Sequence, residues 1–364
     1  MEVIFVLLPA ALIFALAAVA VFAWATRSGP FDDLQTPALR ILGDDAVPRP
    51  HLVDCPRGIP VCREPSGLLD AIGNTPMIKL KRASEETGCT ILAKCEFQNP
   101  GGSLKDRIAK HMIEEAERRG ALRTGMTILE VTSGNTGIAL SMVAAAKGYR
   151  AVIMMPKTVS EERRRMIRSF GAELTLIEEL LHIRDAVARS QEMARADPSI
   201  FLPSQFANPD NPGCHERTTG REILLQTGGK LDAFVMGVGT GGTLMGVGRA
   251  LRAAGSKARV VAVEPDESAV MSGGPPGHHG IQGLADGFIP EIVRLDEVDE
   301  IVRVKTADAV AEAHRLSETE GLLVGVSSGA NVLAATEMAR RLGPGHTIVT
   351  MLPDRGERYL SLGP

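Results

Sequence analysis

The stretch DAFVMGVGTGGTLMGVGRALRAAG, residues 232–255, decides the fold of this chain. Its first residues form a short apolar run typical of a buried strand, and its last residues have the apolar spacing of an amphipathic helix. The glycine-rich turn 237–243 joins the two. A strand that passes through such a turn into a helix leaves backbone N–H groups exposed at the helix N-terminus, which is where an anion binds.

The same order of strand, glycine turn and helix occurs earlier in the chain. The run TILEV, residues 127–131, leads through TSGNTG, residues 132–137, into an apolar helical segment. Other strand-like runs alternate with amphipathic segments: ILAKCEF, AVIMMP, AELTLIE, RVVAVEP and TIVTMLP. This alternation predicts an α/β fold of βαβ units around parallel sheets. No internal repeat is visible, which excludes a solenoid.

Composition limits the function classes. The chain has 364 residues, 44% of them hydrophobic and 23% charged, which is ordinary for a globular protein of two domains or one large α/β unit. Its net charge is -4, and no stretch alternates basic with aromatic residues, so nucleic acid is not an expected partner. The charge run at 161–165, EERRR, is interpreted as the solvated face of a helix.

The five cysteines are odd in number and form no C-x-x-C pair; they are Cys55, Cys62, Cys89, Cys95 and Cys214. Free thiols in a reducing compartment are the expectation, and no metal site is predicted. A metal or haem site near Cys55, Cys62 and His51 is the alternative that the spacing leaves open.

The chain begins with an uncharged apolar segment, residues 3–26. As a helix of about 24 residues it would reach about 36 Å, enough to cross a bilayer, so a single transmembrane anchor is predicted. A cleaved signal peptide is the alternative, because residues 23–25 read A-W-A. The segment is long for such a peptide and starts with the acidic Glu2 in place of a basic region.

Arg27 follows the predicted anchor, and further arginines lie beyond it. The positive-inside rule then leaves the catalytic part on the cytosolic side of a membrane that the sequence does not specify. Residues 27–64 are rich in proline and show no sustained period, which predicts a linker. The folded enzyme should begin near Pro65.

The turn 237–243 taken alone has a second interpretation. It satisfies G-x-G-x-x-G, and Glu264 stands at the end of the next strand, where a dinucleotide fold keeps its ribose-binding acid. A nicotinamide or flavin enzyme is therefore a competing hypothesis. A third element favours different chemistry: NPGGSLKDR, residues 99–107, places Lys105 at the start of a helix. The helix dipole disfavours a charged amine there, which suits Schiff-base chemistry, although most lysines at helix starts are solvated surface groups.

The three elements, in this order and spacing, resemble the fold-type II pyridoxal-phosphate enzymes, specifically the cysteine synthase (O-acetylserine sulfhydrylase) and cystathionine β-synthase group. The resemblance covers residues 67–360 and includes further motifs in order: IGNTP at 72–76, QFANP at 205–209, IQG at 281–283, GFIP at 287–290, SSG at 327–329 and GERY at 356–359. It implies the tryptophan synthase β-like fold of two open parallel sheets. The larger cofactor-binding domain would comprise 65–98 and 209–364, and the smaller mobile domain 99–208.

The resemblance also implies the site. Lys105 would be the Schiff-base lysine and general base, and Asn135 would hold the 3′ oxygen of pyridoxal 5′-phosphate. The neutral Ser327 would face the pyridine nitrogen, which favours β-elimination over transamination. The phosphate would lie on Gly239, Thr240, Gly241, Gly242 and Thr243. The substrate carboxylate would be held by Thr132, Ser133, Gly134, Thr136 and Gln205.

The implied reaction is β-replacement, in which O-acetyl-L-serine loses acetate and sulfide adds to give L-cysteine. The segment 281–288 and the tail 356–359 resemble cysteine synthases, whereas cystathionine β-synthases usually have a tyrosine where Asp286 stands. Gly280 and Asp286 depart from the cysteine synthase pattern beside the expected substrate entrance, so the donor (acetylated, phosphorylated or free serine) and the sulfur source stay open.

The resemblance further implies a homodimer whose small domain closes over the substrate. One alternative is cystathionine β-synthase-type condensation of serine with homocysteine. Another is a non-catalytic partner that docks a serine acetyltransferase tail, against which the intact Lys105, Asn135 and Ser327 argue.

Overall fold

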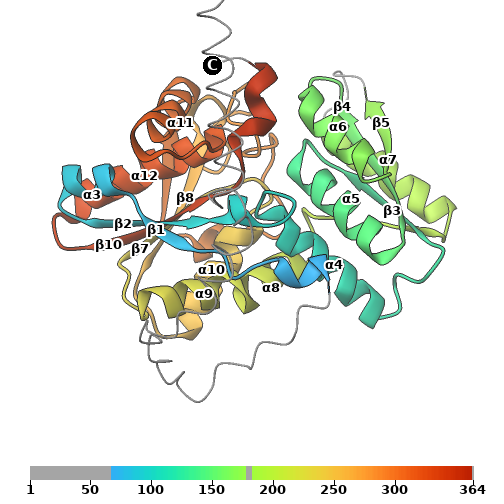
Figure 1. The fold of residues 1–364 in the computed structure, drawn as a ribbon, viewed down its shortest axis with the longest axis horizontal. Coiled ribbons are helices and arrows are strands. Elements are labelled where there is room, and N and C mark those ends of the chain that lie inside the picture. Colours follow the sequence, from blue (N-terminus) through green and yellow to red (C-terminus); the bar gives the residue numbers. More distant parts are fainter. Residues whose placement is uncertain (1–66, 178–182, 363–364) are drawn as a thin grey trace, which may run out of the picture. The chain divides into compact units, whose positions relative to one another are not determined.

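The computed structural model describes residues 67–177 and 183–362, which lie in one compact unit, Glu64–Pro364. Two sheets with helices on their faces make up this unit (Figure 1). The predicted α/β fold with parallel sheets is confirmed. The domain limits drawn from the resemblance stay a prediction.

The larger sheet has six strands in the order β1-β2-β10-β7-β8-β9. Its strands are β1 (Met77–Lys79), β2 (Thr90–Cys95), β7 (Ala233–Gly237), β8 (Arg259–Pro265), β9 (Glu300–Val304) and β10 (Thr347–Leu352). Neighbouring strands run parallel except β1, which pairs antiparallel with β2. The prediction of parallel strands is therefore wrong at this edge of the sheet. An antiparallel neighbour needs no crossover helix, and β1 has only three residues.

Helices cover both faces of the six-stranded sheet (Figure 1). On one face lie α3 (Lys81–Thr87), α11 (Thr306–Glu320) and α12 (Val326–Leu342), and on the other α8 (Asp210–Arg217), α9 (Thr219–Thr227) and α10 (Gly242–Ala253). The central strand β7 reads AFVMG and is buried throughout. Val235 packs into the α12 side and Phe234 into the α10 side, which is why this strand is apolar at every position.

The smaller sheet is fully parallel, in the order β5-β4-β3-β6. It consists of β3 (Thr127–Val131), β4 (Arg150–Pro156), β5 (Glu173–Ile177) and β6 (Ile200–Phe201), and its helices are α4 (Lys105–Arg118), α5 (Asn135–Lys147), α6 (Glu161–Ser169) and α7 (Ile183–Ala196). Its core forms around Ile128, Ile138 and Ile153. Short 3₁₀ helices complete the described elements: η1 (Leu68–Ala71), η2 (Glu96–Gln98), η3 (Asp266–Ser268), η4 (Leu295–Glu297) and η5 (Gly356–Leu362).

The predicted anchor 3–26, the linker 27–64 and the candidate ligands around Cys55 and Cys62 lie outside the described residues. Within 67–177 and 183–362, no helix combines the length and the apolar character needed to cross a bilayer. The described cysteines, Cys89, Cys95 and Cys214, are buried and free, as predicted.

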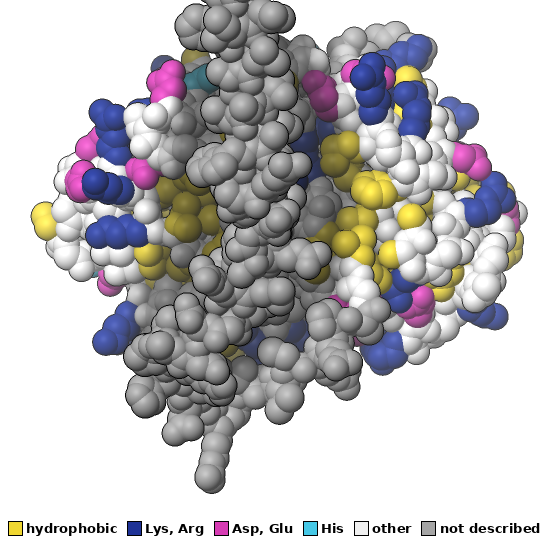
Figure 2. All heavy atoms as spheres, in the orientation of Figure 1, with side chains coloured by type: hydrophobic (Ala, Val, Ile, Leu, Met, Phe, Trp, Pro, Cys, Tyr) yellow, Lys and Arg dark blue, Asp and Glu magenta, His cyan; other side chains and the backbone are white. Residues whose placement is uncertain are grey.

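Charged side chains of both signs are interspersed on the face drawn in Figure 2. Strong fields that attract a polyanion come from patches of a single sign. The described residues on this face build no such patch.

Candidate active site

One pocket collects loops that follow the carboxyl ends of β3 and β7, together with the start of α4 and the first turn of α12. Ligands of open α/β sheets bind at this end of the strands. Every residue predicted for the site lines this pocket except Gly242, which lies between two of the lining residues in the loop 239–243. The lining residues among those predicted are Lys105, Thr132, Ser133, Gly134, Asn135, Thr136, Gln205, Gly239, Thr240, Gly241, Thr243 and Ser327. Their individual roles stay predictions.

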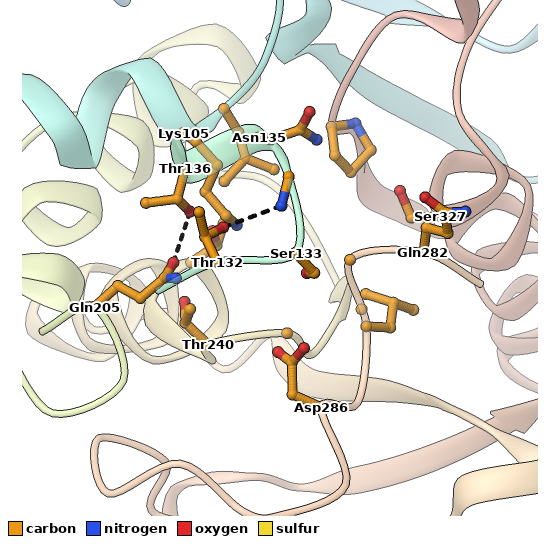
Figure 3. A pocket seen from close by; sticks show the side chains of 18 of the residues that line it. Lys105, Thr132, Ser133, Asn135, Thr136, Gln205, Thr240, Gln282, Asp286 and Ser327 are labelled. Atoms are coloured by element: carbon orange, nitrogen blue, oxygen red, sulfur yellow. Dashed lines mark hydrogen bonds between the residues drawn. The ribbon is translucent and has the colours of Figure 1, made fainter. Parts of the chain in front are cut away.

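Lys105 is the first residue of α4 and reaches into the pocket (Figure 3). Desolvation lowers the pKa of its amine to about 8, against the opposing effects of the Asp354 and Asp286 carboxylates. The sequence analysis attributed a lowered pKa of Lys105 to the helix dipole, whereas burial is the largest cause in the structure. A pKa of about 8 leaves about a tenth of the amine neutral at pH 7, and only the neutral amine forms a Schiff base or accepts a proton.

The loop 239–243 lies at the N-terminus of α10, which begins at Gly242. A Cβ on Gly239 would stand 2.2 Å from the backbone oxygen of Gly283, and a Cβ on Gly242 would stand 1.8 Å from Oδ1 of Asn211. Gly241 has a φ of 83°, in the left-handed region that glycine adopts without strain. The loop GTGGT has no acidic side chain, so its backbone N–H groups and the helix dipole offer a cradle for a phosphate group.

The loop 132–136 lies at the N-terminus of α5, which begins at Asn135. The Thr136 hydroxyl donates to Oε1 of Gln205 at 2.6 Å, and the Thr132 hydroxyl accepts from the Gly134 N–H at 3.1 Å (Figure 3). Nε2 of Gln205 donates in turn to the Val131 carbonyl at 3.2 Å. These bonds fix hydroxyl and amide groups around a helix N-terminus, which suits a substrate carboxylate.

Asn135 and Ser327 reach the pocket from different helices. Nδ2 of Asn135 donates to Oδ2 of Asp354 at 2.6 Å, and its Oδ1 accepts from Arg358. The predicted cofactor contact of Asn135 would thus be oriented by a carboxylate and a guanidinium. Ser327 stands in the first turn of α12 and is buried.

Arg163 is a pocket residue that the sequence interpretation missed. The run 161–165 was interpreted as a solvated face, but Arg163 is only 2% exposed and lines the pocket. It donates to Oε1 of Gln282 and lies over the ring of Tyr359. That interpretation was wrong for this arginine, because helical spacing turns it inward while Arg165 stays exposed.

Asp286 also lines the pocket, half-buried. Burial raises the pKa of its carboxyl to about 6, with Lys105 acting in the opposite direction. The sequence analysis noted that Asp286 departs from the cysteine synthase pattern beside the expected substrate entrance, but it assigned this residue no chemical role.

Glu264 is the acid that a dinucleotide site would need, but its carboxylate binds the protein's own backbone and side-chain donors. Its carboxylate accepts the backbone N–H groups of Met271 at 2.8 Å and Ser272 at 3.0 Å, together with the Ser272 hydroxyl at 2.5 Å. These bonds hold the loop after β8. The carboxylate is therefore already occupied by protein donors.

A family model described as "Pyridoxal-phosphate dependent enzyme" matches residues 68–354, which span both sheets and the whole pocket. The chain belongs to this family. A second family model, described as "Cytochrome oxidase maturation protein cbb3-type", matches residues 2–45, ahead of the enzyme.

Relatives of this pyridoxal-phosphate dependent enzyme include a cysteine synthase of Staphylococcus aureus, 49% identical over 291 residues, or 80% of this chain and 94% of that protein. The structure of an O-ureido-L-serine synthase matches 81% of this chain and 93% of its own, with 44% identity and a TM-score of 0.78. A cysteine synthase structure from Entamoeba histolytica matches 83% of this chain and 91% of its own, with 42% identity and a TM-score of 0.78. The prediction of a cysteine synthase-type enzyme that uses pyridoxal phosphate is confirmed.

The pocket fits this cofactor. The 239–243 loop, where a Cβ on Gly239, Gly241 or Gly242 would collide with neighbouring protein atoms, would hold its phosphate, and the Lys105 amine would meet its aldehyde. Ser327 lines the same pocket and would offer a neutral hydroxyl to the ring nitrogen of the cofactor.

Proposed function

We propose that the enzyme makes L-cysteine from O-acetyl-L-serine and sulfide by β-replacement. The observation that carries this proposal is that the Lys105 amine, with its lowered pKa, and the loop 132–136 at the N-terminus of α5 line one pocket. Pyridoxal phosphate, when bound, supplies the electron sink that stabilises negative charge at the substrate Cα.

Different residues of the chain carry out different parts of this reaction. The loop 132–136 binds the substrate carboxylate and so orients Cα toward Lys105. Lys105 removes the Cα proton, acetate leaves Cβ, and sulfide adds to Cβ before Lys105 returns the proton. Ser327 presents no negative charge, so it does not hold a proton on the ring nitrogen, and this favours elimination at Cβ over transamination.

An absorption spectrum of the purified enzyme tests the proposal. A Schiff base on Lys105 gives a visible band, and O-acetylserine should shift it before sulfide restores it with release of cysteine. A spectrum without such a band would contradict the use of pyridoxal phosphate. A band that responds to serine with homocysteine, but not to O-acetylserine with sulfide, would favour condensation of the cystathionine type.

We also propose that residues 3–26 anchor the enzyme in a membrane, with the catalytic part in the cytosol. The uncharged run of 3–26 and Arg27 after it support this proposal. The separate family match of residues 2–45 supports treating this segment as a module of its own. Full-length protein should stay with membranes after alkaline carbonate washing, whereas protein lacking residues 1–64 should be released and active. Release of the full-length form would contradict the anchor.

A homodimer and a serine acetyltransferase partner complete the proposal. Sedimentation of the form lacking residues 1–64 measures the dimer. Co-sedimentation with serine acetyltransferase measures the second partner.

A further inference from the structure

Asn211 lies in the first turn of α8, outside the set of residues that line the pocket. The residue is fully buried. Its Nδ2 donates two hydrogen bonds, one to the Gln205 carbonyl at 2.8 Å and one to Oγ1 of Thr240 at 3.1 Å. Gln205 and Thr240 both line the pocket (Figure 3). One amide group therefore bonds the segment that carries Gln205 and also the loop 239–243.

The Asn211 amide is fixed in one orientation. A carbonyl oxygen can only accept a hydrogen bond, so the amide atom that faces the Gln205 carbonyl must be the nitrogen. The other amide atom, Oδ1, is buried and accepts no hydrogen bond from the described residues. It lies 1.8 Å from the position that a Cβ on Gly242 would take. The glycine at 242 therefore leaves the room that Asn211 needs against the first residue of α10.

The bond from Asn211 determines what the Thr240 hydroxyl can do. A hydroxyl has one hydrogen to donate and two lone pairs that accept. This one accepts from Nδ2 of Asn211 at 3.1 Å and from the Gly242 N–H at 3.5 Å. Within 67–177 and 183–362 it donates to no other residue, so its O–H is left for a group in the pocket. An ionised phosphate offers only acceptors, which suits such a donor.

The second bond from Asn211 acts on the segment of Gln205. The side chain of Gln205 accepts from the Thr136 hydroxyl, and its backbone N–H donates to Oε2 of Glu130 at 3.3 Å. Ser204, the residue before it, has a φ of 55°, in the left-handed region that non-glycine residues rarely adopt. Such a conformation persists only where the surroundings impose it. Asn211 and Glu130 impose it here by holding the carbonyl and the N–H of Gln205.

We propose that Asn211 is a positioning residue that couples the loop 239–243 to the carboxylate-binding residues of the pocket. This inference rests on the proposed function, which gives the phosphate to the loop and the substrate carboxylate to Gln205 and the residues 132–136. When the Thr240 hydroxyl donates to a phosphate oxygen, it accepts from Asn211, and the same amide holds the Gln205 carbonyl. Because coupling between two sites is reciprocal, loss of this amide should weaken the binding of both groups.

The phosphate side is tested with Asn211→Asp, which keeps the shape of the side chain. A carboxyl group has at most one O–H, so at least one of the two donated bonds is lost. Cofactor-free protein is titrated with pyridoxal 5′-phosphate, and separately with pyridoxal, which lacks the phosphate, while absorbance is followed. The dissociation constant for pyridoxal 5′-phosphate should rise about tenfold, and that for pyridoxal should change less than about twofold.

The substrate side is tested in the cofactor-loaded enzyme with two ligands that have no leaving group on Cβ. L-Alanine carries a carboxylate, and L-alaninamide does not. In Asn211→Asp the dissociation constant for L-alanine should rise about tenfold, and that for L-alaninamide should stay within about twofold. Thr240→Val is a second variant, because it keeps the shape but accepts no bond from Asn211. It too should weaken the binding of L-alanine, although Thr240 lies on the phosphate side.

Asn208→Ala is the matched control. Asn208 lies in the same segment, where its Nδ2 donates to the Pro203 carbonyl at 2.9 Å and its Oδ1 accepts from the Asp210 N–H at 2.9 Å. Neither bond reaches a residue that lines the pocket. The variant should therefore not change the ratio of affinities for pyridoxal 5′-phosphate and pyridoxal, or for L-alanine and L-alaninamide.

The outcomes separate this inference from the proposed function. Absence of cysteine formation from O-acetylserine and sulfide in the unmodified enzyme would overturn the proposed function. Equal changes in Asn211→Asp for ligands with and without the charged group would overturn the positioning role, because a residue that only stabilises the fold affects both alike. An unchanged affinity of Thr240→Val for L-alanine would overturn the coupling. That second variant still decides if Asn211→Asp does not fold.

Discussion

The guanidinium carbon of Arg163 lies 4.5 Å from the centroid of the Tyr359 ring. Arg163 belongs to α6, beside the four-stranded sheet, and Tyr359 belongs to η5, which follows the last strand of the six-stranded sheet. Hydrogen bonds on either side strengthen this contact: the Ser160 hydroxyl donates to the Arg358 carbonyl at 2.9 Å, and the Ser361 N–H donates to Glu162 at 2.9 Å. Residues 160–163 and 358–361 thus form a clasp beside the pocket.

Opening this clasp should loosen the pocket. We expect Tyr359→Leu to lose about 1–2 kcal/mol of stability, from the desolvated cation–π contact, and to raise KM for O-acetylserine more than it lowers kcat. Tyr359→Phe is the matched control, because it keeps a ring under Arg163 and loses only the hydroxyl bond to Asp354. Thermal melts and steady-state kinetics check the pair. Equal effects of both variants would contradict the role of the ring.

Replacement of Lys105 should abolish turnover without unfolding the protein. In the proposed mechanism Lys105 forms the Schiff base and moves the Cα proton, so kcat of Lys105→Ala should fall by several orders of magnitude. Lys110→Ala, on the same helix, loses only a bond to the Leu69 carbonyl and serves as the control. Turnover is measured beside circular dichroism. Activity within about tenfold of the unmodified enzyme would contradict the assignment.

The sequence predicts the parts of this enzyme that local patterns encode. The strands that lead into glycine turns and the placement of Lys105 at a helix start lie as expected. The strands β1, β6 and β9 were not anticipated. Two of these have only three and two residues, too few for a period, and the pattern of β9 is mixed at the edge of its sheet.

Interactions between distant segments could not be predicted. Arg107 donates to Oε2 of Glu96 and Oε1 of Glu222, each at 2.7 Å, and Lys94 lies 2.7 Å from Glu222. This buried cluster unites residues of β2, η2, α4 and α9. Arg107 and Glu222 lie 115 positions apart in the sequence, so only the fold brings them together. The pocket position of Arg163 could not be predicted for the same reason, because a run of charged residues does not show which arginine faces a pocket.

Glu130 should make stability depend on pH. Burial raises the pKa of its carboxyl to about 7, above the ordinary value of 4.5, so the folded state binds a proton that the unfolded state has released between these values. Stability from this group is therefore present at low pH and is lost as pH rises toward 7, by up to about 1.4 kcal/mol per pH unit. Glu130→Gln should flatten this slope in urea denaturation between pH 5 and about 7. An unchanged slope would assign the effect to another group.

Ser327 should control the type of reaction. Ser327→Asp places a carboxylate where the resemblance puts the cofactor's ring nitrogen, and a proton held there strengthens charge stabilisation at Cα. Clean β-replacement should give way to side reactions, measured as the ratio of cysteine to pyruvate and transamination products. Ser327→Ala, which stays neutral, should leave the partition near that of the unmodified enzyme. The same partition in both variants would mean that Ser327 does not face the nitrogen.

The phosphate cradle makes the sharpest steric prediction. A Cβ at position 239 would stand 2.2 Å from the Gly283 backbone oxygen, and a backbone atom cannot rotate away as the end of a side chain can. Gly239→Ala must therefore displace either the 239–243 loop or the 281–283 segment, and backbone N–H groups would leave their positions around the phosphate. We expect affinity for pyridoxal phosphate to fall at least tenfold, measured by titrating cofactor-free protein and following absorbance. Gly67→Ala is the control, because its φ of 175° is ordinary extended backbone and nothing lies within 4 Å of its Cβ. Equal affinities in the two variants would mean that the phosphate binds elsewhere in the pocket.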